Sequence, residues 1–144
     1  MRPQVLRLFA AVVLGAALLA PGPAGAQEEI TVRIAKHAQL TGGTAVIRAE
    51  ITCNPLPGVE DFQEAFAGVH QPSTGAESEG GLDGMVVCDG VTRTYTAHLT
   101  PFTDAQFKHG PAIASISVFF CRLVGDEQLC FNAFDGRRVI LRGG

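Results

Sequence analysis

The sequence lacks the short motifs that mark many small enzymes and metalloproteins. It contains no Gly-x-Ser-x-Gly nucleophile motif. It also has no Cys-x-x-Cys or His-x-His spacing, and its four histidines are scattered along the chain. Because structural zinc sites draw their ligands from such closely spaced pairs, we expect neither a metal nor another cofactor. Without a recognisable nucleophile or ligand set, the sequence favours a protein that is not an enzyme.

Positive charge is also scarce. Lys36 and Lys108 are the only lysines, and the net charge of the chain is −3 at pH 7. Proteins that bind nucleic acid use a stripe of basic side chains to neutralise phosphates. The acidic balance of this chain therefore excludes nucleic acid as the expected partner.

No apolar run is long enough to span a membrane, which takes about 20 residues. The longest such run, Leu8 to Ala20, follows Arg2 and Arg7 and precedes a small-x-small site that ends at Ala26. This pattern predicts a Sec-type secretory signal peptide, residues 1–26, cleaved near Ala26. We therefore expect residues 27–144 to form a single secreted domain without a membrane span, in which nine basic side chains face 14 acidic ones.

The four cysteines all follow the expected signal peptide, and an even number in a secreted domain predicts disulfides. The dipeptide Gly125-Asp126 favours a two-residue β-hairpin turn. That turn places Cys121 opposite Cys130 at a non-hydrogen-bonded pair, where side chains come closest. The spacing thus predicts the disulfide Cys121–Cys130 and leaves Cys53 to pair with Cys88.

Apolar residues alternate with polar ones in several segments, which predicts short strands bounded by turns. Strands are expected over residues 30–35, 44–53, 85–88, 91–99 and 112–123, with turns at 41–44, 125–126 and 135–136. The last of these turns would make the end of the chain a three-stranded meander. Glycines and small polar residues predict a long mobile loop over 72–84. We therefore expect an all-β fold, a β-sandwich of seven to eight antiparallel strands with two disulfides.

Residues 59–71 fit two patterns. In a helix, one stripe would be formed by Val59, Phe62, Phe66 and Val69. In a strand, one face would be formed by Ala65, Ala67 and Val69. The strand, from about Phe62 to Gln71, is favoured because the neighbouring segments are strands. The helix stays open as the alternative.

The inward-facing cysteine of Ile51-Thr52-Cys53, followed by the later Cys88, resembles an immunoglobulin-like sandwich. The chain departs from antibody-type domains because it has no tryptophan and because these two cysteines are closer together. The whole exported part is similar to the small two-disulfide secreted proteins of high-GC bacteria. That resemblance is carried by Gly43-Thr44, Ile51–Cys53, Val87–Gly90, Phe107–Ala112 and Val139–Leu141. It implies a fold but no known activity.

Two other secreted families share the size and the number of disulfides. Enediyne-carrying apoproteins hold an aromatic ligand in a cleft near a short-loop disulfide, which Cys121–Cys130 resembles, but the other cysteine pair departs from their pattern. Subtilisin-inhibitor-like proteins carry a Thr-Cys-x-Pro turn similar to Thr52–Pro55. The other cysteine spacings of the subtilisin-inhibitor-like proteins do not occur in this chain. These resemblances imply a small-ligand carrier and a secreted protease inhibitor, respectively.

From these observations we expect a secreted, non-enzymatic protein-interaction or structural module, monomeric, that binds an extracellular protein or a small ligand. A small-ligand carrier with an aromatic cleft is the alternative, and a protease inhibitor ranks below it. The hairpin register places Phe119, Leu123 and Phe134 on its outer face, which is the candidate binding surface.

The outer face and His98 each have a second, purely structural interpretation. The loop over residues 100–110 would cover the outer face if Phe102 or Phe107 packed on it. His98 lies on a face rich in threonine, where it could act as a general base. An exposed strand histidine is the favoured interpretation of that residue.

Overall fold

The computed structural model describes residues 29–144, so the expected signal peptide lies outside the described residues. Within this range the chain forms eight strands and no helix, which confirms the all-β prediction. The strands are β1 (Ile30–Ile34), β2 (His37–Thr41), β3 (Thr44–Cys53), β4 (Val59–Gln71), β5 (Ala76–Gly81), β6 (Arg93–Leu99), β7 (Gly110–Val124) and β8 (Glu127–Gly143). No helix in this part of the chain is long and apolar enough to cross a membrane.

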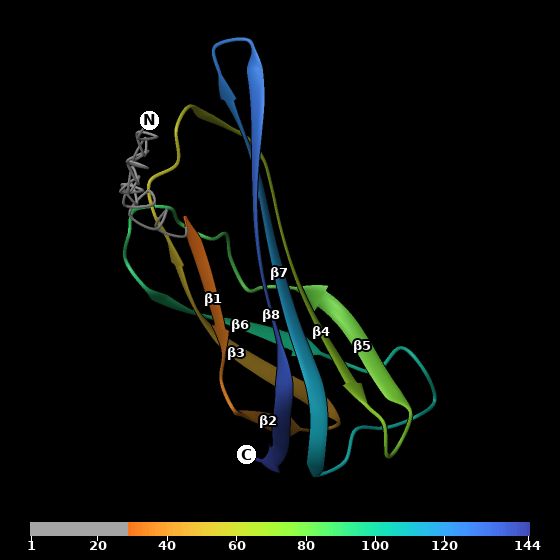
Figure 1. Ribbon diagram of the computed structural model, residues 1–144. Coiled ribbons are helices and arrows are strands. Elements are labelled where there is room, and N and C mark those ends of the chain that lie inside the picture. Colours follow the sequence, from red (N-terminus) through yellow and green to blue (C-terminus); the bar gives the residue numbers. More distant parts are fainter. Residues whose placement is uncertain (1–28) are drawn as a thin grey trace, which may run out of the picture.

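The strands form one continuous hydrogen-bonded path that folds into two layers (Figure 1). β3 pairs with β6 on one edge and with β1 and β2 on the other, while β8, β7, β4 and β5 form the second layer in that order. β2 connects the layers because it also pairs with β8. With β2 counted as the connection, the layer of β1, β3 and β6 faces the layer of β4, β5, β7 and β8. This arrangement of three strands facing four is that of an immunoglobulin-like sandwich. The prediction of antiparallel strands throughout is wrong at one place, since β2 and β8 are parallel.

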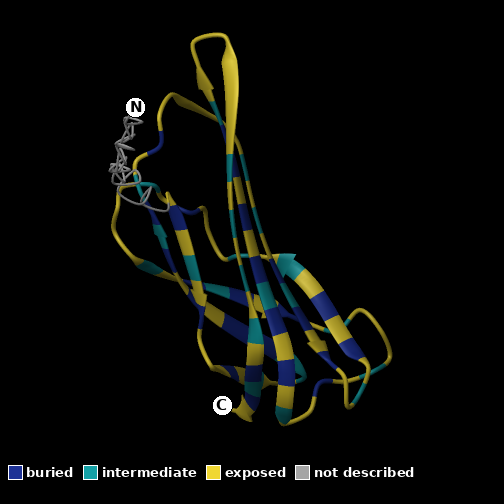
Figure 2. Cartoon of the chain, viewed as in Figure 1, coloured by how far each residue is buried: buried dark blue, intermediate teal, exposed yellow. Residues whose placement is uncertain are grey.

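Buried and exposed residues alternate along β3 and β7, and the buried ones form the core between the layers (Figure 2). The odd-numbered residues of β3 and the even-numbered residues of β7 are buried against one another, as their sequence pattern predicts. They are Ala45, Ile47, Ala49, Ile51 and Cys53 on β3, and Ala112, Ala114, Ile116, Val118 and Phe120 on β7. Because successive residues point to opposite faces, the odd-numbered residues of β7 face away from the core.

Residues 59–71 are the strand β4, which confirms the favoured alternative. The loop predicted over residues 72–84 is wrong, because β5 pairs with β4 within it and buries Ala76 and Ser78. The Ser78 hydroxyl donates to the carbonyl of Thr100 at 2.6 Å. Two partners, a neighbouring strand and the crossing loop, therefore order a segment whose composition alone favours disorder.

The turn predicted at Asp135-Gly136 is also wrong, because β8 continues through both residues and pairs with β7 as far as Leu141. A side-chain oxygen of Asp135 accepts a hydrogen bond from the backbone N–H of Ile34 at 2.7 Å. It also lies 2.8 Å from Arg137. These contacts hold the extended conformation, so the chain ends in one long strand and not in a meander.

Both predicted disulfides are present, and two structural disulfides are typical of proteins in an oxidising compartment. Cys121 and Cys130 are directly opposite each other on β7 and β8. Cys88 is not part of a strand, contrary to the prediction for residues 85–88, and forms only an isolated bridge with Cys53. The disulfide therefore ties a loop, and not a second strand, to the end of β3.

The carboxylate of Asp89, next to Cys88, accepts two hydrogen bonds from the guanidinium of Arg93, at 2.6 and 2.7 Å. These bonds, with the N–H of Val91, lower the pKa of Asp89 from 3.8 to about 2. A carboxyl group whose pKa is lower in the folded state stabilises the fold above its ordinary pKa, and this contribution disappears as the pH falls through the folded value. We expect Asp89→Asn to flatten the fall in stability between about pH 4 and pH 2. Urea unfolding at a series of pH values measures this, and an unchanged pH profile would contradict it.

Candidate functional site

The outer face of the four-stranded layer carries an exposed group of apolar side chains. We define the outer patch as Phe62 and Phe66 of β4, Phe119 and Leu123 of β7, and Phe134 of β8. β4 and β8 flank β7, and residues paired across antiparallel strands point to the same face. The strand pairing therefore gathers these five residues on one surface, although they come from three segments of the chain.

The three residues expected to form the binding surface are all exposed. The exposed fractions are 36% for Phe119, 41% for Leu123 and 69% for Phe134. The crossing loop does not bury them: Phe107 is buried in the core, and Phe102 is itself exposed. The alternative in which this loop covers the outer face therefore does not hold for the patch.

Within the patch, Phe119 packs against Phe62 of β4. Its ring and that of Phe62 meet edge to face with centroids 6.1 Å apart. The ring of Phe134 instead lies over Gly136, where an added Cβ would be only 2.9 Å from it. Phe62 and Phe66 were not assigned to the surface from the sequence. Their alternation with the inward-facing Ala65 and Ala67 was the signal that could have found them.

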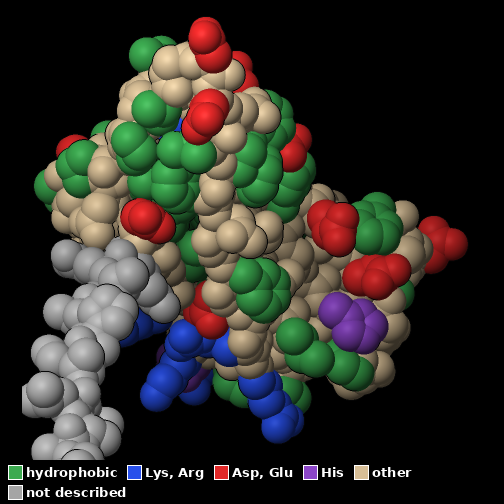
Figure 3. Space-filling view, turned by 45° about the horizontal axis from the view of Figure 1, so that its top comes forward, with side chains coloured by type: hydrophobic (Ala, Val, Ile, Leu, Met, Phe, Trp, Pro, Cys, Tyr) green, Lys and Arg blue, Asp and Glu red, His purple; other side chains and the backbone are tan. Residues whose placement is uncertain are grey.

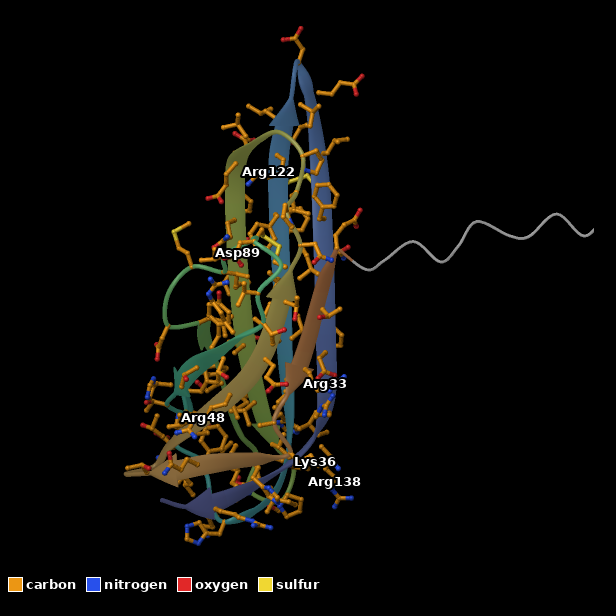
Figure 4. All side chains as sticks on the ribbon, turned by 90° about the vertical axis from the view of Figure 1, so that its left-hand side faces the viewer. Arg33, Lys36, Arg48, Asp89, Arg122 and Arg138 are labelled. Atoms are coloured by element: carbon orange, nitrogen blue, oxygen red, sulfur yellow. A yellow bond between two sulfur atoms is a disulfide. The ribbon has the colours of Figure 1, made fainter. Side chains whose placement is uncertain are left out.

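The upper part of the patch is supported by a projecting hairpin. β7 and β8 extend beyond the rest of the sandwich and turn at Gly125-Asp126 (Figure 1). The disulfide Cys121–Cys130 links the two strands there. The guanidinium of Arg122 donates to the carbonyls of Pro57 and Gly58 at 3.3 and 2.8 Å, which fastens the loop before β4 to the hairpin (Figure 4).

Charged side chains are unevenly distributed over the face of the molecule that Figure 3 draws. Figure 3 shows hydrophobic side chains gathered over the upper part with acidic side chains among them, and basic side chains gathered at the lower end. Figure 4 places Lys36 and Arg138 at the end opposite the hairpin. The strand pairing puts Asp61, Glu64, Glu77 and Glu79 on the outer face, together with Arg138 and Arg142 near the end of β8.

A hollow of about 560 Å³ lies along the side of the sandwich between β1 and β8. Phe131 and Phe134 line it together with several polar residues, among them Thr31, Arg33 and Glu50. Its volume falls within the ~300–1,000 Å³ of small-molecule sites, but those are lined mainly by apolar groups. The hollow is thus large enough for a ligand, and its polar lining does not suit a purely aromatic one.

His98 lies in a second hollow of about 650 Å³, on the outer face of the three-stranded layer. Its Nδ1 is 2.9 Å from a carboxylate oxygen of Asp83, and both side chains are more than half exposed. The hydroxyls of Thr44 and Thr100, which also line the hollow, bond to each other at 3.0 Å. Among residues 29–144, no group of three His, Cys, Asp or Glu side chains is placed to hold a metal ion.

No protein-family model, no curated protein and no solved structure matches this chain.

Proposed function

We propose that the protein is a secreted, non-enzymatic interaction module that binds another protein through the outer patch. The observation that carries this proposal is the set of exposed phenylalanines on a disulfide-linked hairpin and its neighbouring strand. Binding hot spots are typically aromatic side chains clustered on a well-packed support. A rigid support also reduces the entropy lost on binding, because little has to be ordered.

The size of the patch agrees with a protein partner. Three strands about 4.8 Å apart, followed over about eight residues of about 3.4 Å each, cover roughly 400 Å². The largest apolar patch on a typical monomer covers about 300–600 Å² and is often functional, and here part of the area belongs to the polar side chains of Glu64, Ser117 and Asn132. An interface of this area is small, so we expect a reversible complex and not an obligate one.

A small-ligand carrier is the second candidate, favoured by the hollow between β1 and β8 that Phe131 and Phe134 line. Phe134 belongs to both surfaces, whereas Phe119 belongs to the outer patch alone. The two candidates are therefore separated by substitutions at Phe119, which leave the lining of the hollow unchanged.

Capture from the native culture medium tests the proposal. We expect the immobilised wild-type protein to retain a partner that Phe119→Ala no longer retains, because truncation of a hot-spot ring costs at least ~2 kcal/mol of binding. Val91→Ala is the matched control, since Val91 is 54% exposed and lies outside the patch. If the wild-type protein and both variants retain the same amount of the partner, the proposal is contradicted. The circular dichroism of each variant checks that its fold is intact.

A further inference from the structure

The charge of the outer face selects among possible occupants. This face carries the carboxylates of Asp61, Glu64, Glu77 and Glu79 against the guanidiniums of Arg138 and Arg142, which lie near the end of β8. Opposite charges steer association, and like charges placed against each other cost free energy. The outer face of a second copy would bring the same excess of carboxylates to the interface. A partner surface with basic side chains would be attracted.

Glu64 lies at the centre of the aromatic residues. It is directly opposite Phe119 across the β4–β7 pair, while Phe62 and Phe66 lie two residues away on either side along β4. All four side chains are exposed and share the outer face. Within residues 29–144, the side chain of Glu64 makes no hydrogen bond or ion pair, whereas that of Asp61 accepts a hydrogen bond from Gln128 and that of Glu77 is 3.9 Å from His70.

A carboxylate with exposed phenylalanines around it suits one kind of group. A cation held against aromatic rings gains from their electron-rich faces, and it also neutralises the carboxylate. Arginine fits better than lysine, because its planar guanidinium can bind a carboxylate through two hydrogen bonds and can stack on a ring. An acidic or purely aliphatic segment would leave Glu64 desolvated and unpaired, which is costly.

We propose that the outer patch binds a protein segment that carries an arginine among apolar residues, with the guanidinium against Glu64 between Phe62, Phe66 and Phe119. This inference rests on the proposed function, because it names the partner of the same surface. The apolar residues of the segment cover Leu123 and Phe134, and the arginine fixes the register of the segment on the sheet.

A random short-peptide library displayed on phage provides a defined probe. The oxidised protein is the bait, and clones that also bind Phe119→Ala are removed. We expect the remaining peptides to share an arginine flanked by aliphatic or aromatic residues. Glu64→Gln should weaken their binding about tenfold, in line with the loss of a charged hydrogen bond. Glu79→Gln, which removes an unpaired carboxylate elsewhere on the same face, should change the affinity far less.

The possible outcomes separate this inference from the proposed function. Peptides that need Phe119 but share no basic residue, or that bind Glu64→Gln as tightly as the wild type, overturn the inference and leave the proposed function standing. If every clone that binds the wild type also binds Phe119→Ala, so that none is left after the removal step, both are contradicted. Replacement of the shared arginine by lysine should weaken binding measurably, and equal affinity would contradict the stacked guanidinium.

Discussion

Replacement of both Cys53 and Cys88 by alanine should lower the free energy of unfolding by about 4 kcal/mol. The disulfide closes a loop of 35 residues, and its loss returns conformational entropy to the unfolded chain. Cys53 is fully buried in the core, so the substitution also removes packed volume. For a domain of this size, a loss of about 4 kcal/mol corresponds to a fall in melting temperature of roughly 15 °C. Urea unfolding followed by circular dichroism measures the change.

The second disulfide supplies the control. Cys121 and Cys130 are only nine residues apart, so their replacement by alanine should cost about 2.5 kcal/mol by the same entropy argument. A greater loss of stability from the short loop than from the long one would contradict this account of how the disulfides stabilise the fold.

The next large effect is expected at Gly58, in the loop that Arg122 fastens to the hairpin. Its φ of +75° is unfavourable for any residue with a side chain, by about 1–2 kcal/mol. A Cβ at this position would also lie 2.1 Å from the carbonyl oxygen of Leu123, a backbone atom that cannot move without disturbing the β4–β7 pair. We therefore expect Gly58→Ala to lower the free energy of unfolding by about 3 kcal/mol or more.

Gly75→Ala isolates the contribution of the close contact. Gly75 has a similar φ of +73°, but no atom lies within 4 Å of the position its Cβ would take. Gly75→Ala should lower the free energy of unfolding only by the cost of placing alanine at a positive φ, about 1–2 kcal/mol. Equal losses at Gly58 and Gly75, measured by urea unfolding, would show that the loop before β4 moves away from the hairpin at little cost.

The hairpin and its disulfide could be derived from the sequence because two local signals agree. Gly125-Asp126 sets the register, and that register brings Cys121 opposite Cys130. Alternation in β3 is equally local, since every residue except Val46 is buried or at least partly exposed according to its position in the strand. Where turn chemistry, spacing and alternation agree, the structure follows the prediction.

The errors arise where contacts distant in sequence override a local preference. Asp135-Gly136 has the composition of a turn, yet Ile34, about 100 residues earlier, donates a hydrogen bond that holds Asp135 in an extended strand. β5 has little apolar surface and is ordered by β4 and by the carbonyl of Thr100. Neither contact leaves a signal in the segment itself.

The candidate surface was only half accessible to sequence reasoning. Its β7 and β8 members follow from the hairpin register, whereas Phe62 and Phe66 depend on how β4 pairs with β7. That pairing joins segments about 55 residues apart and contains a bulge between Glu60 and Phe62. The alternation from Phe62 onward shows which residues of β4 share a face, but not which strand pairs with β4 and brings that face beside Phe119.

Hydroxyl-radical footprinting of the protein, free and bound to its captured partner, tests the outer patch most directly. We expect oxidation of Phe62, Phe119 and Phe134 to fall in the complex, while Val91, exposed outside the patch, is oxidised as in the free protein. Unchanged oxidation of Phe62 and Phe119, with protection of Phe131 in the hollow between β1 and β8, would contradict the proposed binding surface.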